Sequence, residues 1–373
     1  MLQSLKNTAR LTLKELRAIR ADKVMLVLIF YVFTVATYMV ADAISTEIND
    51  LAVAVVDEDQ SPLSQHLTDA IRAPMFKTPD SLTPDQAEAA LKVGGYVLVV
   101  SFPPEMERDL RAGRATTIKI DADTTAIAQA GNGATFLQQL LAAELSAWAA
   151  PSGANTTNLV SVVFRNLFNP NLTSKWFTSV MELMNSITIL TLILAGASLI
   201  REREHGTIEH VLVMPVRPHE IVLSKIAANG AVILAASVFS LVVVVEWIIG
   251  VPIGGSLGLF VLGTAVYVVA VAALGLMLAS FTHTMGQFGL LIIPVIIVMI
   301  LLSGGMTPME SMPDWLQTLM KLISPAPHFV AFAQGVLYRG AGASVLAPEI
   351  GAMAAMAAVA LTVVVARFRK VLS

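Results

Sequence analysis

The chain has 373 residues, of which 55% are hydrophobic and 14% charged, and its mean hydropathy is +0.72. A soluble domain carries about 25% charged residues, so this composition excludes an ordinary soluble protein and indicates a membrane protein with several spans. The chain contains no cysteine, which excludes a disulfide framework and a thiolate metal site.

The N-terminal segment, residues 1–23, combines leucine and isoleucine with six basic side chains. This pattern predicts an amphipathic interfacial helix on the cytoplasmic surface of the membrane, where anionic lipids attract basic residues. The apolar run at 24–44 follows directly and predicts the first membrane span, TM1. A nucleic-acid-binding tail is the alternative for 1–23, and the adjoining span disfavours it.

Residues 45–175 are more polar and carry alternating strand and helix signals. The strand signals are short apolar runs, at 52–56, 96–101, 116–120 and 159–168. Ser61-Pro62 and Thr83-Pro84 are typical of helix starts, and a long helix is expected over 126–148. About 130 residues suffice for an independent domain, so we expect a folded α/β domain here.

Further apolar runs predict TM2 to TM6 within 177–373, at 177–200, 226–249, 257–279, 287–302 and 347–366. The segment 303–342 is too polar to span and too apolar for a loop, which favours short helices dipping into the outer leaflet. The predicted fold is an α-helical polytopic membrane protein of six transmembrane helices, with an α/β extracytoplasmic domain inserted between helices 1 and 2.

The orientation follows from the basic residues of the short loops. Lysine and arginine gather before TM1, between TM2 and TM3, and after TM6, whereas the short loops on the other side hold Lys321 and Arg339. Basic loops stay in the cytoplasm, so both termini and the TM2–TM3 loop are expected there. The domain at 45–175 is then expected outside the cytoplasm.

The TM2–TM3 loop contains a charged and apolar segment, residues 200–215. Thr207 can cap a helix, Glu209 suits its first turn, and Pro215 discourages its continuation. On that helix Val211 and Leu212 share a face with Ile208. Amphipathicity alone allows either docking on a partner or a capped turn lying on lipid headgroups.

The run Glu204-His205-Gly206-Thr207-Ile208-Glu209, continued to Pro215, resembles the E-x-G-T-hydrophobic-E motif of ABC-2-type ABC transporter permeases. The resemblance extends over essentially the whole chain. It implies a cytoplasmic coupling helix at 202–215 that docks in a groove of an ATPase subunit. The residues expected at that contact are Glu204, Gly206, Thr207, Glu209, Val211, Leu212 and Pro215. Met214 departs from the family, where many relatives carry Thr or Ser before the proline.

The resemblance also implies the assembly. No G-x-x-x-x-G-K-[ST] phosphate loop occurs in the chain, so ATP and Mg are expected on a partner ABC ATPase and no cofactor on this chain. Two permease subunits, identical or close paralogues, would export a hydrophobic or amphipathic substrate across a bacterial inner membrane. The family further implies a helical hairpin at 303–342 and partners such as a periplasmic adaptor protein and an outer-membrane channel.

Some polar residues near the spans are candidates for a pathway or for interhelical hydrogen bonds: Glu182, Asn185, Ser186, Thr188 and Glu246. No catalytic or metal site is predicted, because the acidic runs at 57–59 and 121–123 follow strands and are typical of solvated turns. The rival function is a membrane-anchored sensor or scaffold that recognises a ligand through 45–175. An intramembrane enzyme is a weaker third possibility, since no nucleophile and base pair stands out.

Overall fold

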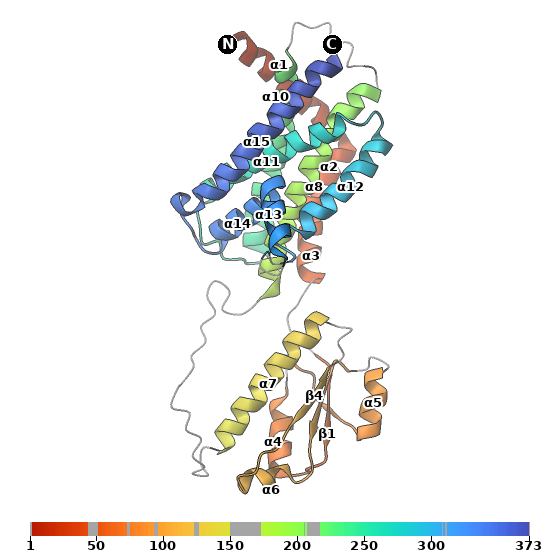
Figure 1. The fold of residues 1–373 in the computed structure, drawn as a ribbon, viewed down its shortest axis with the longest axis vertical. Helices are drawn as coiled ribbons and strands as arrows, with labels where there is room; N and C mark the ends of the chain where they lie inside the picture. Colours follow the sequence, from red (N-terminus) through yellow and green to blue (C-terminus); the bar gives the residue numbers. More distant parts are fainter. Residues whose placement is uncertain are drawn as a thin grey trace. The chain divides into compact units, whose positions relative to one another are not determined.

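The computed structural model describes residues 2–43, 51–72, 75–92, 96–122, 127–149, 173–204, 206, 217–307, 309 and 312–372. The chain divides into two compact units, shown in Figure 1. The membrane unit comprises Met1–Ser45 and Ser174–Ser373, and the α/β unit comprises Thr46–Thr173.

The membrane unit begins with two helices separated at Asp22. Helix α1 covers Leu2–Ala21, and the first span covers Lys23–Ala43 as α2 (Lys23–Tyr31), the π-helical η1 (Val32–Ala36) and α3 (Thr37–Ala43). The Asp22 carboxylate caps α2 by accepting a hydrogen bond of 3.0 Å from the Met25 N–H. This cap explains why the amphipathic helix and the span are separate elements.

The remaining helices of this unit follow as α8 (Ser174–Glu204), α10 (Pro218–Phe239) with its π-helical continuation η4 (Ser240–Ile248), α11 (Leu257–Ala279), α12 (Met285–Leu301), α13 (Asp314–Ile323), α14 (Ala326–Leu337) and α15 (Ala343–Leu372). Among the described residues, five helices are long and apolar enough to cross a membrane, and they include the one at Lys23–Ala43. The polytopic helical fold is therefore confirmed. The expected fifth span, α12, has only 17 residues.

Helix α8 is the centre of the membrane unit. Of the 18 residues in its most apolar stretch, 83% are buried, whereas the corresponding share in α15 is 17%. Glycine permits this close packing: a Cβ built on Gly275 of α11 would lie 2.6 Å from the Leu192 carbonyl oxygen of α8. The α8 and α11 backbones are therefore in direct contact, as the adjacent ribbons of Figure 1 illustrate.

The α/β unit is a four-stranded sheet covered on both faces. Its strands are β1 (Val53–Asp57), β2 (Asp80–Ser81), β3 (Leu98–Phe102) and β4 (Lys119–Ala122), in the order β2-β1-β3-β4, with only β3 and β4 antiparallel. Its helices are α4 (Pro62–Ala70), α5 (Pro84–Lys92), α6 (Met106–Arg111) and α7 (Ile127–Ala149). Val53 and Val55 pack with residues of α4 and α7, whereas Ala54 and Val56 pack with Ala87 of α5. The two-residue alternation of β1 thus builds two apolar layers.

Most elements of the α/β unit lie within a few residues of those expected from the sequence. Ser61 caps α4 through the Ser64 N–H, and Pro62 occupies its first turn. Strand β2 was not predicted, because its two residues are exposed and carry no apolar pattern. The strand expected at 159–168 lies outside the described residues.

Candidate functional site

The cytoplasmic motif expected from the sequence begins at the last residue of α8. Glu204 Oε1 accepts a hydrogen bond of 2.8 Å from the Met285 N–H in the first turn of α12. The first N–H groups of a helix lack intrahelical partners and favour negative charge, so this carboxylate completes the α12 N-terminus. Glu204 is therefore engaged within its own chain.

Arg203 fixes the other side of the same turn. Its guanidinium Nη1 donates to the Thr282 carbonyl at 2.7 Å and to the Ala279 carbonyl at 3.4 Å. These carbonyls belong to the end of α11 and the turn after it, where the regular i+4 hydrogen bonds of the helix stop. Arg203 and Glu204 together fasten the turn between α11 and α12 to the end of α8.

Gly206 has φ +64°, and its N–H donates to the Arg203 carbonyl at 3.1 Å. Glycine adopts this left-handed conformation without the strain that a Cβ would introduce, and such residues commonly end helices. The glycine of the motif therefore has a physical reason, because its positive φ ends α8.

The predicted coupling helix at 202–215 is described only at its start. Residues 202–204 belong to α8 itself. The other expected contact residues lie outside the described residues, namely Thr207, Glu209, Val211, Leu212 and Pro215. Their part in docking stays a prediction.

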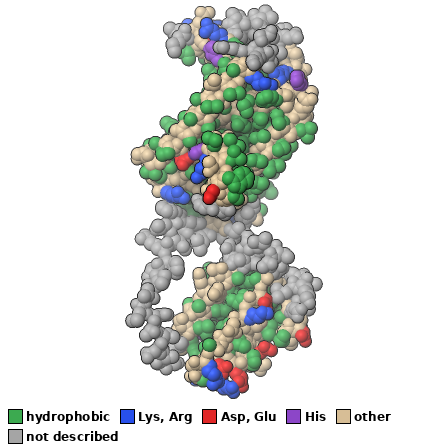
Figure 2. Space-filling model, in the orientation of Figure 1, with side chains coloured by type: hydrophobic (Ala, Val, Ile, Leu, Met, Phe, Trp, Pro, Cys, Tyr) green, Lys and Arg blue, Asp and Glu red, His purple; other side chains and the backbone are tan. Residues whose placement is uncertain are grey.

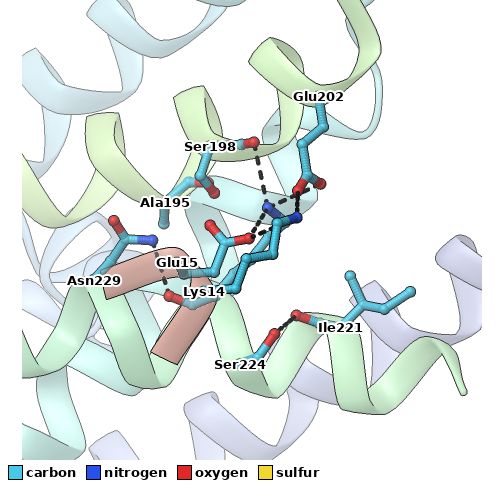
Figure 3. Close-up of polar contacts among 9 residues, drawn as sticks. Lys14, Glu15, Ala195, Ser198, Glu202, Ile221, Ser224 and Asn229 are labelled. Atoms are coloured by element: carbon cyan, nitrogen blue, oxygen red, sulfur yellow. Dashed lines mark hydrogen bonds and ion pairs between the residues drawn. The ribbon is translucent and has the colours of Figure 1, made fainter. Parts of the chain in front are cut away.

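Near the end of α8, a charge cluster joins α1, α8 and α10 (Figure 3). It consists of Lys14, Glu15, Glu202 and Lys225. The Lys225 ammonium lies 2.9 Å from Glu202 and 3.2 Å from Glu15, and its side chain is 1% exposed. It also donates to the Ser198 carbonyl at 3.4 Å. A buried ammonium requires such partners, so Lys225 binds the three helices together.

A cavity of about 340 Å³ adjoins the charge cluster and is lined by residues of α1, α2, α8 and α10. At its edge the Arg201 guanidinium lies 2.9 Å from the Asp22 carboxylate. The Met25 N–H, followed by the hydrogen bond from Arg201, holds the pKa of Asp22 below its ordinary value. Asp22 thus links the start of the first span to α8.

Helix α1 packs along α10, where sequence reasoning expected only a membrane surface. Leu11 and Ile19 are buried in the core of the membrane unit, whereas Leu5 remains 66% exposed. Asn7 Nδ2 donates to Glu220 of α10 at 3.4 Å. The amphipathic pattern predicted the helix. It did not predict that some of its apolar residues pack in the core while others stay exposed.

The polar residues expected in the spans occupy different environments. The Thr188 and Tyr267 hydroxyls are 2.7 Å apart and join α8 to α11, and Ser186 donates to Glu182 at 3.3 Å. Asn185 lines a cavity of about 10 Å³ beside Thr188, roughly the space of one water molecule. Glu246 is exposed on η4. Thr188 is thus an interhelical residue, and Glu246 faces away from the packed helices.

Two parts of this site escaped the sequence analysis. Lys225 directly precedes the span expected at 226–249, among the basic residues of the TM2–TM3 loop, but the structure buries it within α10. Tyr267, whose ring stacks on Phe329 with centroids 4.0 Å apart, has no sequence signal beyond a lone hydroxyl in an apolar run. Among the described residues no group of three histidine or acidic side chains is arranged to hold a metal.

Comparison with known proteins decides the family. The family model described as "ABC-2 family transporter protein" matches residues 24–366. The chain belongs to this family. The resemblance inferred from the 204–215 motif is therefore confirmed.

Curated relatives extend over nearly all of this ABC-2 family member. The inner membrane transport permease YhhJ of Escherichia coli K12 is 41% identical over 99% of this chain and 98% of its own length. The probable multidrug ABC transporter permease YbhR of the same strain is 28% identical over 88% of this chain and 89% of its own. These matches do not favour a sensor or scaffold.

Proposed function

We propose that this chain is the membrane-spanning subunit of an ATP-driven ABC-2 exporter for a hydrophobic or amphipathic substrate. A separate ABC ATPase subunit, carrying ATP and Mg, docks on the segment that starts at Glu204 and hydrolyses the nucleotide. The names of YhhJ and YbhR as transport permeases support the class. One observation carries the proposal: the motif starts at Glu204, at the end of α8 where this helix is bonded to its neighbours.

The contacts at the end of α8 suit force transmission. Glu204 and Arg203 hold the turn between α11 and α12, and Glu202 reaches α1 and α10 through Lys225 and Lys14. Because α8 is largely buried, it moves only together with its neighbours. A displacement of the docked segment would therefore move α8 together with the helices packed on it. Such joint movement is what a switch between two discrete arrangements of the helices requires.

The proposed topology has six spans in a bacterial inner membrane. Helix α12 is counted as the fifth span, because 17 residues rise about 26 Å and lie at the short end of the range that crosses a bilayer. Both termini face the cytoplasm, and the α/β unit lies outside it. The complete exporter contains a second copy or a paralogue of this chain, and the α/β unit meets a periplasmic adaptor protein and an outer-membrane channel.

The experiment is co-purification with the ATPase encoded beside this gene, followed by an assay of ATP hydrolysis. Since Glu204 caps α12, Glu204→Arg would disturb the fold and cannot report on docking alone. Glu209→Arg and Leu212→Arg are the sharper probes. We expect each to weaken the complex by about tenfold or more, the effect of ~1.4 kcal/mol, with an unchanged gel-filtration profile.

Lys6→Glu is a matched control, since it reverses a charge outside the motif. A complex that forms equally well with Glu209→Arg, Leu212→Arg and the control would contradict docking at this segment. Failure of the wild type to bind any ATPase would contradict the transporter function itself.

A further inference from the structure

A long apolar groove runs along the outside of the membrane unit between α11, α13 and α15. Its volume is about 640 Å³, within the range of ligand sites in proteins. Leu274 of α11, Leu322 of α13 and Val359 of α15 are among its lining residues. Leu322 and Val359 are 73% and 65% exposed, so the groove opens to the surroundings of the helices.

One end of the groove is polar. His328 Nδ1 lies 2.6 Å from the Glu349 carboxylate, and its Nε2 lies 2.9 Å from the Lys321 carbonyl oxygen. These contacts tie α13, α14 and α15 together at the level of Glu349. Figure 2 shows broad apolar surface over the membrane unit, with few charged side chains interrupting it.

The charges at this end are not equivalent. Glu349 is engaged by His328, whereas the exposed Lys321 ammonium forms no ion pair within the described part of the chain. Lys321 and His328 both line the groove. A ligand that enters the groove therefore meets the Lys321 ammonium, which is not ion-paired with a carboxylate of the described residues.

The length of the groove matches one half of a bilayer. From Ala352 to Val363 the lining residues of α15 rise about 17 Å at 1.5 Å per residue, and half of the hydrocarbon core is about 15 Å. The polar end precedes Ala352 by one helical turn, at Glu349. An apolar path one leaflet long with a cation at its head suits an amphipath that carries a chain and an anionic headgroup.

We propose that this groove binds one anionic phospholipid, with an acyl chain along α15 and the phosphate on Lys321. The site goes beyond the proposed export function and does not depend on ATPase docking. Selectivity comes from the headgroup, because an acyl chain is already in an apolar medium when it lies in the membrane. A basic side chain near the surface favours anionic over zwitterionic lipid by about fivefold.

The test is native mass spectrometry of the purified full chain, titrated with phosphatidylglycerol or phosphatidylcholine of identical acyl chains. The wild type should retain phosphatidylglycerol about fivefold better. Lys321→Gln should abolish this preference, and Ala355→Phe, which fills the groove, should lower the retention of both lipids. Arg339→Gln and Ala358→Phe are the matched controls, since both positions are exposed and neither lines the groove.

Equal retention of the two lipids by the wild type would overturn the proposal, as would a preference that survives Lys321→Gln. If Ala355→Phe retained both lipids as well as Ala358→Phe does, the groove would not hold the acyl chain. Detection of a second copy of the chain, in place of lipid, that is displaced by Ala355→Phe would also refute it. Each variant is checked for an unchanged melting temperature and for unchanged ATPase co-purification, which separates this result from the proposed function.

Discussion

Replacement of Lys225 by methionine tests whether the charge cluster fastens α1, α8 and α10. The Lys225 side chain is 1% exposed, and those of Glu15 and Glu202 are 12% and 15% exposed. Methionine has a similar length but no charge, so Lys225→Met leaves two poorly solvated carboxylates with Lys14 as their neighbour. Breaking a buried pair from one side costs about 3–5 kcal/mol.

The expected result is a large loss of thermal stability. At about 2–4 °C per kcal/mol for a unit of this size, Lys225→Met should lower the melting temperature in detergent by roughly 6–20 °C. Lys14→Met is the matched control, because the Lys14 side chain is 52% exposed and an exposed pair contributes about 0–1 kcal/mol. Fluorescence-monitored unfolding of the purified variants measures both.

A double-mutant cycle separates the ion pair from simple loss of packing. Glu202→Gln removes one of the two carboxylates, so it should partly rescue Lys225→Met, with a coupling energy of about 1–3 kcal/mol. Strict additivity of the two substitutions, or a cost for Lys225→Met no larger than that for Lys14→Met, would refute the role assigned to the cluster.

Three further predictions concern single contacts. Gly275→Val should separate α8 from α11, because its Cβ would lie 2.6 Å from the Leu192 carbonyl, and gel filtration should show loss of the folded species. Arg203→Met should release the turn after α11, raising hydrogen exchange there while the α/β unit is unchanged. Burial raises the pKa of Glu107, but hydrogen bonds from the Leu63 N–H and Arg111 outweigh it and hold the pKa below its ordinary value. The resulting stabilisation is present at neutral pH and lost as the pH falls through the folded pKa, so Glu107→Gln should flatten the acid dependence of α/β-unit hydrogen exchange.

The apolar spans were predictable because their length alone satisfies the bilayer constraint. The expected span at 257–279 coincides with α11, and Ser256 caps it through the Leu259 N–H. The ends of α8 and α10 were harder to predict, because charged residues continue both helices beyond their apolar runs. Lys225 shows why: its sequence context is that of a loop cation, and only the proximity of Glu15, 210 residues away, explains its burial.

Contacts between residues far apart in the sequence also limit what could be predicted of the candidate docking site. The sequence motif identified Glu204 and Gly206 as members of one functional group, yet the structure gives each a role within the chain. Glu204 completes α12, and Gly206 ends α8 through its positive φ. The role of Gly206 is local, because its N–H bonds the Arg203 carbonyl three residues earlier. The role of Glu204 cannot be derived from local spacing, since the Met285 N–H is 81 residues away.

Helix α8 connects the two polar regions of the membrane unit. Near its middle Thr188 is hydrogen-bonded to Tyr267 of α11, and at its C-terminal end Glu202 is paired with Lys225 of α10. Between these points Leu192 and Gly275 bring the α8 and α11 backbones into contact. Because polar contacts bracket a closely packed glycine contact, bending of α8 between its ends is disfavoured. Movement that starts at the motif should therefore reach Tyr267 by displacement of α8 and α11 as one body, with constant distances between these two helices.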